Sequence, residues 1–179
     1  DEMDHGFKTA ELVSVSLQEE GHYETLKAAV SSHPAVTQVG ATRHIFGGGT
    51  SGVDAEINGK QTSIDILQIG ENYADMIQLQ YVQGRSLDAL RQDDLDNAVL
   101  ATESFMREYG LEFGTDARVK IFGKERRIVG VVGDFLTNGV WRKIAPCLIT
   151  VIPKERYAWL TVAYSGVSPI EMSTFMTRE

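Results

Sequence analysis

The stretch that decides the fold is "RRIVGVVGDF", Arg126–Phe135. It opens with a run rich in valine and isoleucine, which predicts a buried strand. Gly130 and Gly133 interrupt the run, and because no helical pattern follows, we interpret both as bulge or turn glycines. The preceding apolar run, Arg118 to Phe122, ends at Gly123-Lys124, so the two runs are predicted to form a hairpin.

A strand and a capped helix precede this hairpin. Ala98 to Leu100 predicts a short strand, and Thr102 is a good N-cap for the helix that follows it. Apolar side chains recur there at helical spacing, and Gly110 provides a stop signal. The order of strand, helix and hairpin indicates a mixed α/β unit in the middle of the chain.

The N-terminal part predicts a strand, a helix and a strand. Leu12 to Leu17 alternates apolar and polar residues, a helix follows Gly21, and Pro34 forbids its extension. A second strand is expected from Val36 to Phe46.

A hairpin comes next, because Asn58-Gly59 suits a tight turn in which both central residues need positive φ. In the returning strand Ile64 and Ile66 share one parity, whereas Leu67 and Ile69 have the other. The change of parity predicts a bulge or a change of sheet.

The C-terminal part predicts two more strands and a helix. Cys147 to Ile152 is apolar on both faces and is typical of a central strand, and alternation around Val162 predicts another. Ser168 and Glu171 form a capping box for a final helix. Because no C-cap follows before Glu179, we expect the natural chain to continue.

These elements predict an α+β fold with two subdomains. Residues 1–71 and 144–179 form an outer subdomain, a β-α-β layer built from both ends of the chain. Residues 72–143 form an inserted, smaller mixed α/β subdomain.

Composition narrows the class of function. The 179 residues are 42% hydrophobic, which is enough for a packed core. The net charge of -8 and the pI of about 5.0 disfavour a nucleic-acid binder, which needs a basic face. A single cysteine, Cys147, excludes an internal disulfide, and no apolar run approaches the roughly 20 residues of a membrane helix.

An aspartate-rich loop is the first candidate for chemistry. Asp88, Asp93, Asp94 and Asp96 follow Gly84-Arg85 closely. An EF-hand loop beginning at Asp94 would have Ala98 and Val99 where an oxygen ligand and glycine belong, so calcium is disfavoured. We interpret the loop as a solvated edge, with Asp93 and Asp94 facing a partner if they act at all.

Other catalytic and cofactor motifs fail on spacing. Gly59-Lys60 and Gly123-Lys124 lack the remaining residues of a Walker loop, so the chain itself is not expected to bind ATP. The four histidines have no metal-ligand spacing, and no nucleophile elbow is present. We therefore predict no catalytic, cofactor or metal residues. Trp141, beside Arg142, is a candidate partner contact or part of a lid on the smaller subdomain.

Taken in order, several motifs resemble the periplasmic core domain of MacB/FtsX-type ABC transporter permeases. The matching stretches are "YVQGRSL", the aspartate-rich loop, "AVLATESFMREYGLE", Gly114-Thr115, "RRIVGVVGDF" and "APCLITVI". They assign family-motif positions to Gly84, Arg85, Gly130, Asp134 and Phe135.

This resemblance implies a non-catalytic domain between two membrane helices, on the extracytoplasmic, periplasmic face of the bacterial inner membrane. It implies a Porter subdomain formed by both chain ends and an inserted Sabre subdomain. The implied partners are a cytoplasmic ATPase subunit, a second permease copy, and a periplasmic adaptor, lipoprotein or hydrolase. The domain would couple ATP hydrolysis to a periplasmic shape change, and the isolated fragment is expected to be monomeric and to need no cofactor.

Two alternatives remain open. The chain could be a stand-alone extracytoplasmic module that binds a ligand or a protein. It could also be a metal-dependent enzyme that uses the Asp88–Asp96 cluster.

Overall fold

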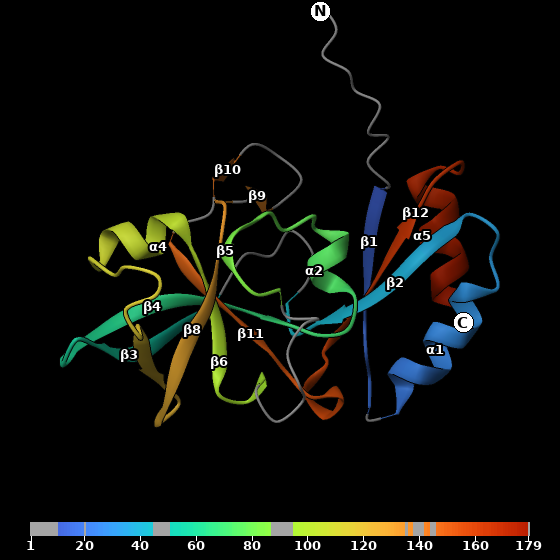
Figure 1. The fold of residues 1–179 in the computed structure, drawn as a ribbon. Helices are drawn as coiled ribbons and strands as arrows, with labels where there is room; N and C mark the ends of the chain where they lie inside the picture. The colour runs from blue at the N-terminus through green and yellow to red at the C-terminus, as the bar shows by residue number, and fades with distance from the viewer. Residues whose placement is uncertain are drawn as a thin grey trace, which may run out of the picture.

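The computed structural model describes residues 11–19, 21–44, 51–86, 95–134, 136–137, 142–143 and 146–178. Within them a ten-stranded sheet runs through the whole molecule (Figure 1). Six of its strands close on themselves, because β3 pairs with both β7 and β4. Around this closed sheet the order is β4 (Lys60–Ile69), β11 (Cys147–Val151), β6 (Ala98–Thr102), β8 (Lys124–Val132), β7 (Arg118–Ile121) and β3 (Ser51–Ile57).

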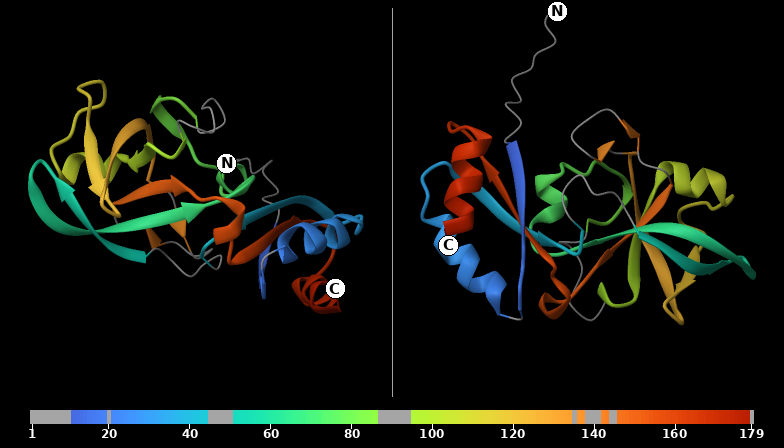
Figure 2. Two further views of the ribbon diagram at one scale, coloured as in Figure 1. Left: turned by 90° about the horizontal axis from the view of Figure 1, so that it is seen from below. Right: turned by 180° about the vertical axis from the view of Figure 1, so that it is seen from behind.

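The remaining strands of the path form a smaller layer made from both ends of the chain. In it β12 (Trp159–Tyr164) lies between β1 (Glu11–Ser16) and β2 (Val36–Thr42), antiparallel to both. Two helices, α1 (His22–Ser31) and α5 (Pro169–Arg178), cover one face of this end layer (Figure 2). Strand β2 meets the end of β4, where Thr42 pairs with Ile69 and three backbone hydrogen bonds link residues 41–43 to residues 68–71, and this short pairing joins the end layer to the closed sheet.

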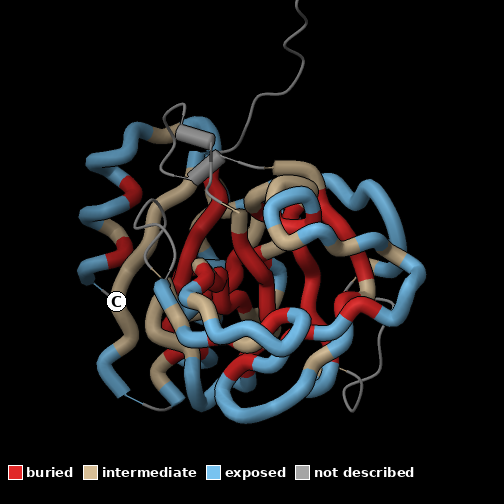
Figure 3. Tube along the Cα trace, turned by 90° about the vertical axis from the view of Figure 1, so that its left-hand side faces the viewer, coloured by how far each residue is buried: buried red, intermediate tan, exposed pale blue. Residues whose placement is uncertain are grey.

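Three hydrophobic cores follow from this arrangement. Figure 3 marks the buried residues of the chain in red. The first fills the closed sheet, and α4 (Glu103–Glu108) contributes the buried Phe105 and Met106 to it. The second lies between the end layer and its two helices. The third covers the outer face of β4, β6 and β11, beneath α2 (Tyr73–Met76).

The shorter elements lie around the closed sheet. They are β5 (Tyr81–Gly84), which pairs with β8, the two-stranded pair β9 (Leu136–Thr137) and β10 (Arg142–Lys143), and the 3-10 turn η2 (Lys154–Arg156). None of the helices in the described part of the chain combines the length and the apolar character that a bilayer crossing requires.

The local sequence predictions agree with this fold. The Asn58-Gly59 turn has φ values of 54° and 77°, and Thr102 Oγ1 accepts a hydrogen bond from the amide of Phe105 at 3.2 Å. At the final helix the Glu171 amide donates to Ser168 Oγ at 3.1 Å. The register of β6 against β8 shifts beside Gly130, as expected of a bulge glycine. The mixed α and β composition of the predicted class is confirmed.

Of the two alternatives predicted after Ile66, a bulge is not found, but the strand does change its neighbour there, since β3 pairs with it up to Ile66 and β2 pairs with Ile69. Strand β4 is continuous, and its pairing with β3 shows no register shift from Lys60 to Ile66. The parity changes because Ile64 and Ile66 enter the core inside the closed sheet, whereas Leu67 and Ile69 enter the core outside it. One unbroken strand is therefore buried on both faces.

The expected second strand is also shorter than predicted, since β2 ends at Thr42. The predicted subdomain boundaries, after residue 71 and before residue 144, cross the continuous closed sheet. Strands β3 and β11 lie outside residues 72–143 in sequence, yet β3 pairs with β7 and β11 pairs with β6, both from within that segment. The division into two subdomains stays a prediction.

Candidate functional site

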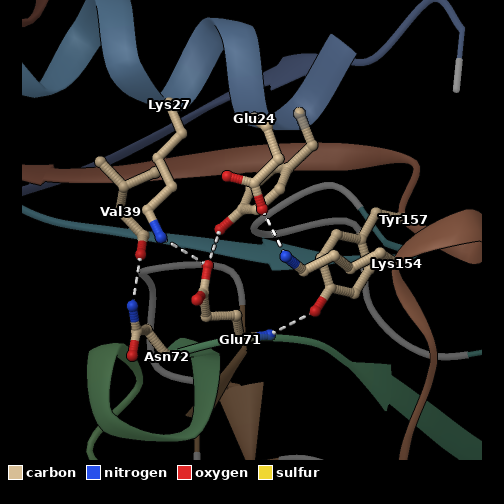
Figure 4. A network of polar contacts seen from close by, with 8 residues as sticks. Glu24, Lys27, Val39, Glu71, Asn72, Lys154 and Tyr157 are labelled. Atoms are coloured by element: carbon tan, nitrogen blue, oxygen red, sulfur yellow. Dashed lines mark hydrogen bonds and ion pairs between the residues drawn. The ribbon is translucent and has the colours of Figure 1, made fainter. Parts of the chain in front are cut away.

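A network of polar contacts surrounds Glu71, in the corner between β4 and α2. Its carboxylate accepts hydrogen bonds from the Tyr23 hydroxyl at 2.6 Å and from Lys27 Nζ at 2.8 Å. Both donors lie on α1, four residues apart and therefore on one face of the helix. Figure 4 shows this carboxylate pointing up toward α1.

The backbone of the same residue holds two other elements. The Glu71 amide donates to the Tyr157 hydroxyl at 3.0 Å, and the Glu71 carbonyl accepts from the Ala41 amide on β2 at 3.0 Å. Tyr157 follows η2, on the connection from β11 to β12. One residue therefore ties α1, β2 and that connection to the end of β4, and we name this set of contacts the Glu71 junction.

The corner has the close packing that these contacts require. Asn72 adopts a positive φ of 62°, and its side-chain amide donates to the Val39 carbonyl at 2.9 Å. A Cβ on Gly40 would lie 2.5 Å from the Met76 sulfur. A Cβ on Gly70 would overlap with the Tyr157 ring. Glycine at both positions lets β2 and Tyr157 reach the corner.

A second contact between α1 and η2 lies at the surface. Lys154 Nζ is 2.5 Å from a Glu24 carboxylate oxygen, and both side chains are more than half exposed (Figure 4). Exposed ion pairs contribute little to stability, so we expect this contact to add little to the free energy of unfolding. Behind it, the rings of Tyr23 and Tyr157 meet edge to face at 5.0 Å.

Electrostatics favour the ionised form of Glu71. Its burial opposes ionisation, but hydrogen bonds from Lys27 and Tyr23 and the nearby lysine charges together lower its pKa. The pKa of Tyr23 is raised, first by burial and then by its hydrogen bond to Glu71. At neutral pH the pair is therefore a carboxylate bound by a neutral phenol, which suits a stable contact and not proton transfer.

A cleft of about 400 Å³ opens at the junction, lined in part by Glu71, Asn72 and Tyr157. Its floor is apolar, with Ile69 and Ile152, and its rim carries Asp75, Glu155 and Lys154. This volume lies within the usual range of small-molecule sites, roughly 300–1,000 Å³. No group of three or more histidine, cysteine or acidic residues in the described segments is arranged to hold a metal ion.

The predicted Gly-Arg motif lies in a tight crossing. Gly84 has a φ of 79° and pairs with Gly130, and a Cβ on Gly84 would overlap with the Val129 carbonyl. The Arg85 amide donates to that same carbonyl at 3.0 Å, and a Cβ on Gly130 would lie 2.7 Å from the Arg85 carbonyl. The motif glycines therefore allow β5 to lie against β8.

Asp134 binds the first turn of α4 through its carboxylate. Its carboxylate accepts from the Ser104 amide at 3.1 Å and from the Ser104 hydroxyl at 2.7 Å. Arg107 lies 3.6 Å away on the same helix. A carboxylate at a helix N-terminus satisfies free amides and interacts favourably with the helix dipole.

The other candidate residues are placed only in part. Asp93, Asp94, Phe135 and Trp141 lie outside the described residues, as do Asp88 and most of the aspartate-rich loop. Arg142 belongs to β10, which pairs with β9, and its side chain is not described. The partner role of these residues stays a prediction.

Cys147 behaves as its sequence context predicts. It is fully buried in the outer core, and burial first, then Asp65 and Asp134, raise its pKa to about 12. Such a thiol is unreactive at neutral pH.

Sequence reasoning missed Glu71. The "GEN" turn after an apolar strand marked a corner, and the spacing of Tyr23 and Lys27 marked a helix face. Neither pattern shows that the corner and the helix face meet, because the pairs span 48 and 44 residues of sequence.

Three solved structures have a similar overall fold. The periplasmic region of MacB from Actinobacillus actinomycetemcomitans matches with a TM-score of 0.58 and 20% identity, over 90% of this chain and 73% of that one. The extracellular domain of the noncanonic ABC-type transporter YknZ from Gram-positive bacteria matches with a TM-score of 0.58 and 16% identity, over 93% and 87%. A permease-protein domain from Porphyromonas gingivalis matches with a TM-score of 0.59 and 16% identity, over 91% and 78%.

The chain has the fold of these domains. The resemblance read from the motif order is therefore confirmed at the level of the fold. No protein-family model and no curated protein matches the sequence. At identities of 16–20% the likeness carries the architecture and not the activity.

Proposed function

We propose that the chain is a non-catalytic extracytoplasmic domain of an ABC transporter permease, on the periplasmic face of the bacterial inner membrane. The observation that supports this function is a fold shared over at least 90% of the chain with a periplasmic, an extracellular and a permease domain. In the full assembly its partners are a cytoplasmic ATPase subunit and a second permease copy. Cytoplasmic ATP hydrolysis drives a change of shape in this domain.

The Glu71 junction suits a change of shape. The end layer and the closed sheet have separate cores, and a short stretch of backbone pairing between residues 41–43 and residues 68–71 joins β2 to the end of β4. Polar contacts of the Glu71 carboxylate, which is one-third exposed, reinforce this short joint. Polar contacts of this kind can break and re-form at a modest cost in free energy.

The location is tested by labelling a single introduced cysteine in cells that express the full-length protein. Gln61→Cys places a thiol at the exposed start of β4. The unmodified protein is the control, because Cys147 is buried and should not be labelled. We expect a membrane-impermeant maleimide to label Gln61→Cys once the outer surface of the inner membrane is accessible. Labelling only after the inner membrane is lysed would contradict the proposal.

The coupling is tested by hydrogen exchange on the full-length permease with its ATPase subunit. We compare the ADP-bound complex with one held by a non-hydrolysable ATP analogue. Amides of α1 and of residues 70–73 should differ in protection between the two states, because they lie at the junction. Identical protection throughout the domain would rule out coupling through this fold.

The cleft beside Tyr157 favours a second candidate function, a stand-alone ligand-binding module. Its volume of about 400 Å³ and its apolar floor suit a small amphipathic molecule. The labelling and exchange experiments separate the two functions, since a stand-alone module needs neither an ATPase partner nor a nucleotide-dependent state.

A further inference from the structure

The turn of the β7–β8 hairpin has an unusual residue, whereas the turn of the β3–β4 hairpin has a typical one. Both have two-residue turns with positive φ, Asn58-Gly59 at 54° and 77° and Phe122-Gly123 at 52° and 73°. The first central position of such a turn is normally asparagine, aspartate or glycine. A bulky side chain at positive φ is an outlier, so the phenylalanine is costly to the fold.

The phenylalanine ring gains little packing in return. It is 51% exposed, among the few large apolar side chains of the described chain that face solvent. The Arg126 guanidinium lies 5.9 Å from the ring centroid. Strained residues that a fold does not need tend to occur at functional sites.

The hairpin is also basic within an acidic chain. Residues 118–127 carry five bases and one acid, whereas the whole chain has a net charge of -8. Arg118 and Arg127 are paired with Asp116, at 3.2 and 3.6 Å. No ion pair within the described segments involves Lys124 or Arg126. The tip of the hairpin therefore presents an exposed aromatic ring beside the exposed Lys124, and the half-buried Arg126, whose charge also interacts with Asp96, lies behind them. This tip lies at the lower edge of the molecule in Figure 1.

We propose that this tip binds a partner protein whose surface offers an apolar pocket rimmed by carboxylates. Phe122 fills the pocket, and Lys124 and Arg126 meet the carboxylates. Buried aromatic and arginine side chains are the usual anchors of protein interfaces. An anionic bilayer is a poorer fit, because lipid recognition typically uses clusters of about four or more unpaired basic residues. The proposal rests on the hairpin alone and does not depend on the permease function.

The turn itself supplies a variant that separates binding from folding. Phe122→Asn copies the Asn58-Gly59 turn and removes the ring. Relief of the positive-φ strain offsets the lost ring contact with Arg126, so the thermal midpoint should stay within about 2 °C of the unmodified protein. Phe122→Trp keeps an aromatic anchor and is the conservative control.

The partner is first captured on the full-length protein in its own cells. A photoreactive phenylalanine analogue replaces Phe122, and in a matched control it replaces Asn58 at the other hairpin. We expect a protein adduct at position 122 that is absent at position 58. Adducts with lipid or with a second copy of this chain, or no adduct at all, would overturn the proposal.

The captured protein is then purified and titrated calorimetrically with each variant at two salt concentrations. Phe122→Asn should weaken binding by at least about tenfold, Phe122→Trp should bind about as well as the unmodified protein, and affinity should fall as salt rises. Equal affinity of the asparagine variant would refute the anchor. A fall in its thermal midpoint of more than about 5 °C would instead show that the ring is structural.

Discussion

Replacing Glu71 by glutamine tests whether the junction depends on a charge. The variant keeps the size of the side chain and the two backbone contacts to Tyr157 and Ala41. It loses the charge that the Tyr23 hydroxyl meets at 2.6 Å and Lys27 Nζ at 2.8 Å. Hydrogen bonds to charged groups contribute about 1.5–3 kcal/mol when buried.

The contribution of each hydrogen bond to Glu71 is smaller than this range, because solvent screens part of the interaction. The Glu71 side chain is 33% exposed and that of Lys27 is 30% exposed, so the ion-pair part is largely screened. We expect the free energy of unfolding to fall by about 1.5 kcal/mol in total. For a chain of this size the thermal midpoint should fall by roughly 3–6 °C.

The assay is thermal and denaturant unfolding of both proteins across pH, with Glu24→Gln as a matched control. Glu24 also contacts a lysine, but that pair is more than half exposed, so the control should leave the midpoint unchanged within about 1 °C. If Glu71→Gln also stays within about 1 °C of the unmodified protein, the junction does not depend on the charge.

The pH dependence provides an independent check with a defined sign. The pKa of Glu71 is lowered in the fold from its ordinary value of 4.5, so its contribution is present above that value. The contribution is lost as pH falls through the lowered pKa of the folded state. The unmodified protein and Glu71→Gln should therefore differ in stability at pH 7 and converge in strong acid. A difference that stays constant with pH would refute the role of the carboxylate charge.

Three further predictions follow from particular contacts. Gly84→Ala should cost at least about 2 kcal/mol in chemical unfolding, because it adds a backbone overlap to a positive φ, whereas Gly114→Ala, with open space around it, should cost about 1 kcal/mol. Asp134→Ala should lower the free energy of unfolding by about 1–2 kcal/mol and weaken amide protection in α4, whereas Arg107→Ala, on a side chain 66% exposed, should be close to neutral. Cys147 should not react with a thiol reagent at pH 8 until the protein is unfolded, since its pKa is about 12.

Local signals were sufficient where the interaction itself is local. Asn58-Gly59, Thr102 and Ser168 each act within a few residues, so the sequence predicts the turn and the two helix caps. Strand β4 was harder to predict from the sequence, because a change of apolar parity can result from a bulge or from burial on both faces. Only the neighbours of Ile66 and Leu67 in space distinguish them.

The Glu71 junction could not be predicted from the sequence either, because it too depends on which residues are neighbours in space. A carboxylate after a Gly in a turn is ordinary, and a tyrosine and a lysine four residues apart on a helix are ordinary too. Their contact depends on the short backbone pairing of residues 41–43 with residues 68–71, which brings β2 beside the end of β4 and α1 close to Glu71. Reading that pairing from sequence would require the strand order of the sheet.

The Gly84-Arg85 and "GVVGD" motifs show how two separate sequence signals can have one cause. Gly84 pairs with Gly130, and each glycine lacks the Cβ that would meet the other strand's backbone. A side chain at either position would push β5 away from β8 and remove the hydrogen bond from the Arg85 amide to Val129. The two motifs therefore form a single crossing, and substitutions at its two glycines should not be additive. The unfolding free energy of a Gly84→Ala/Gly130→Ala double variant should lie above the value expected from adding the single losses, because the first clash already separates the strands.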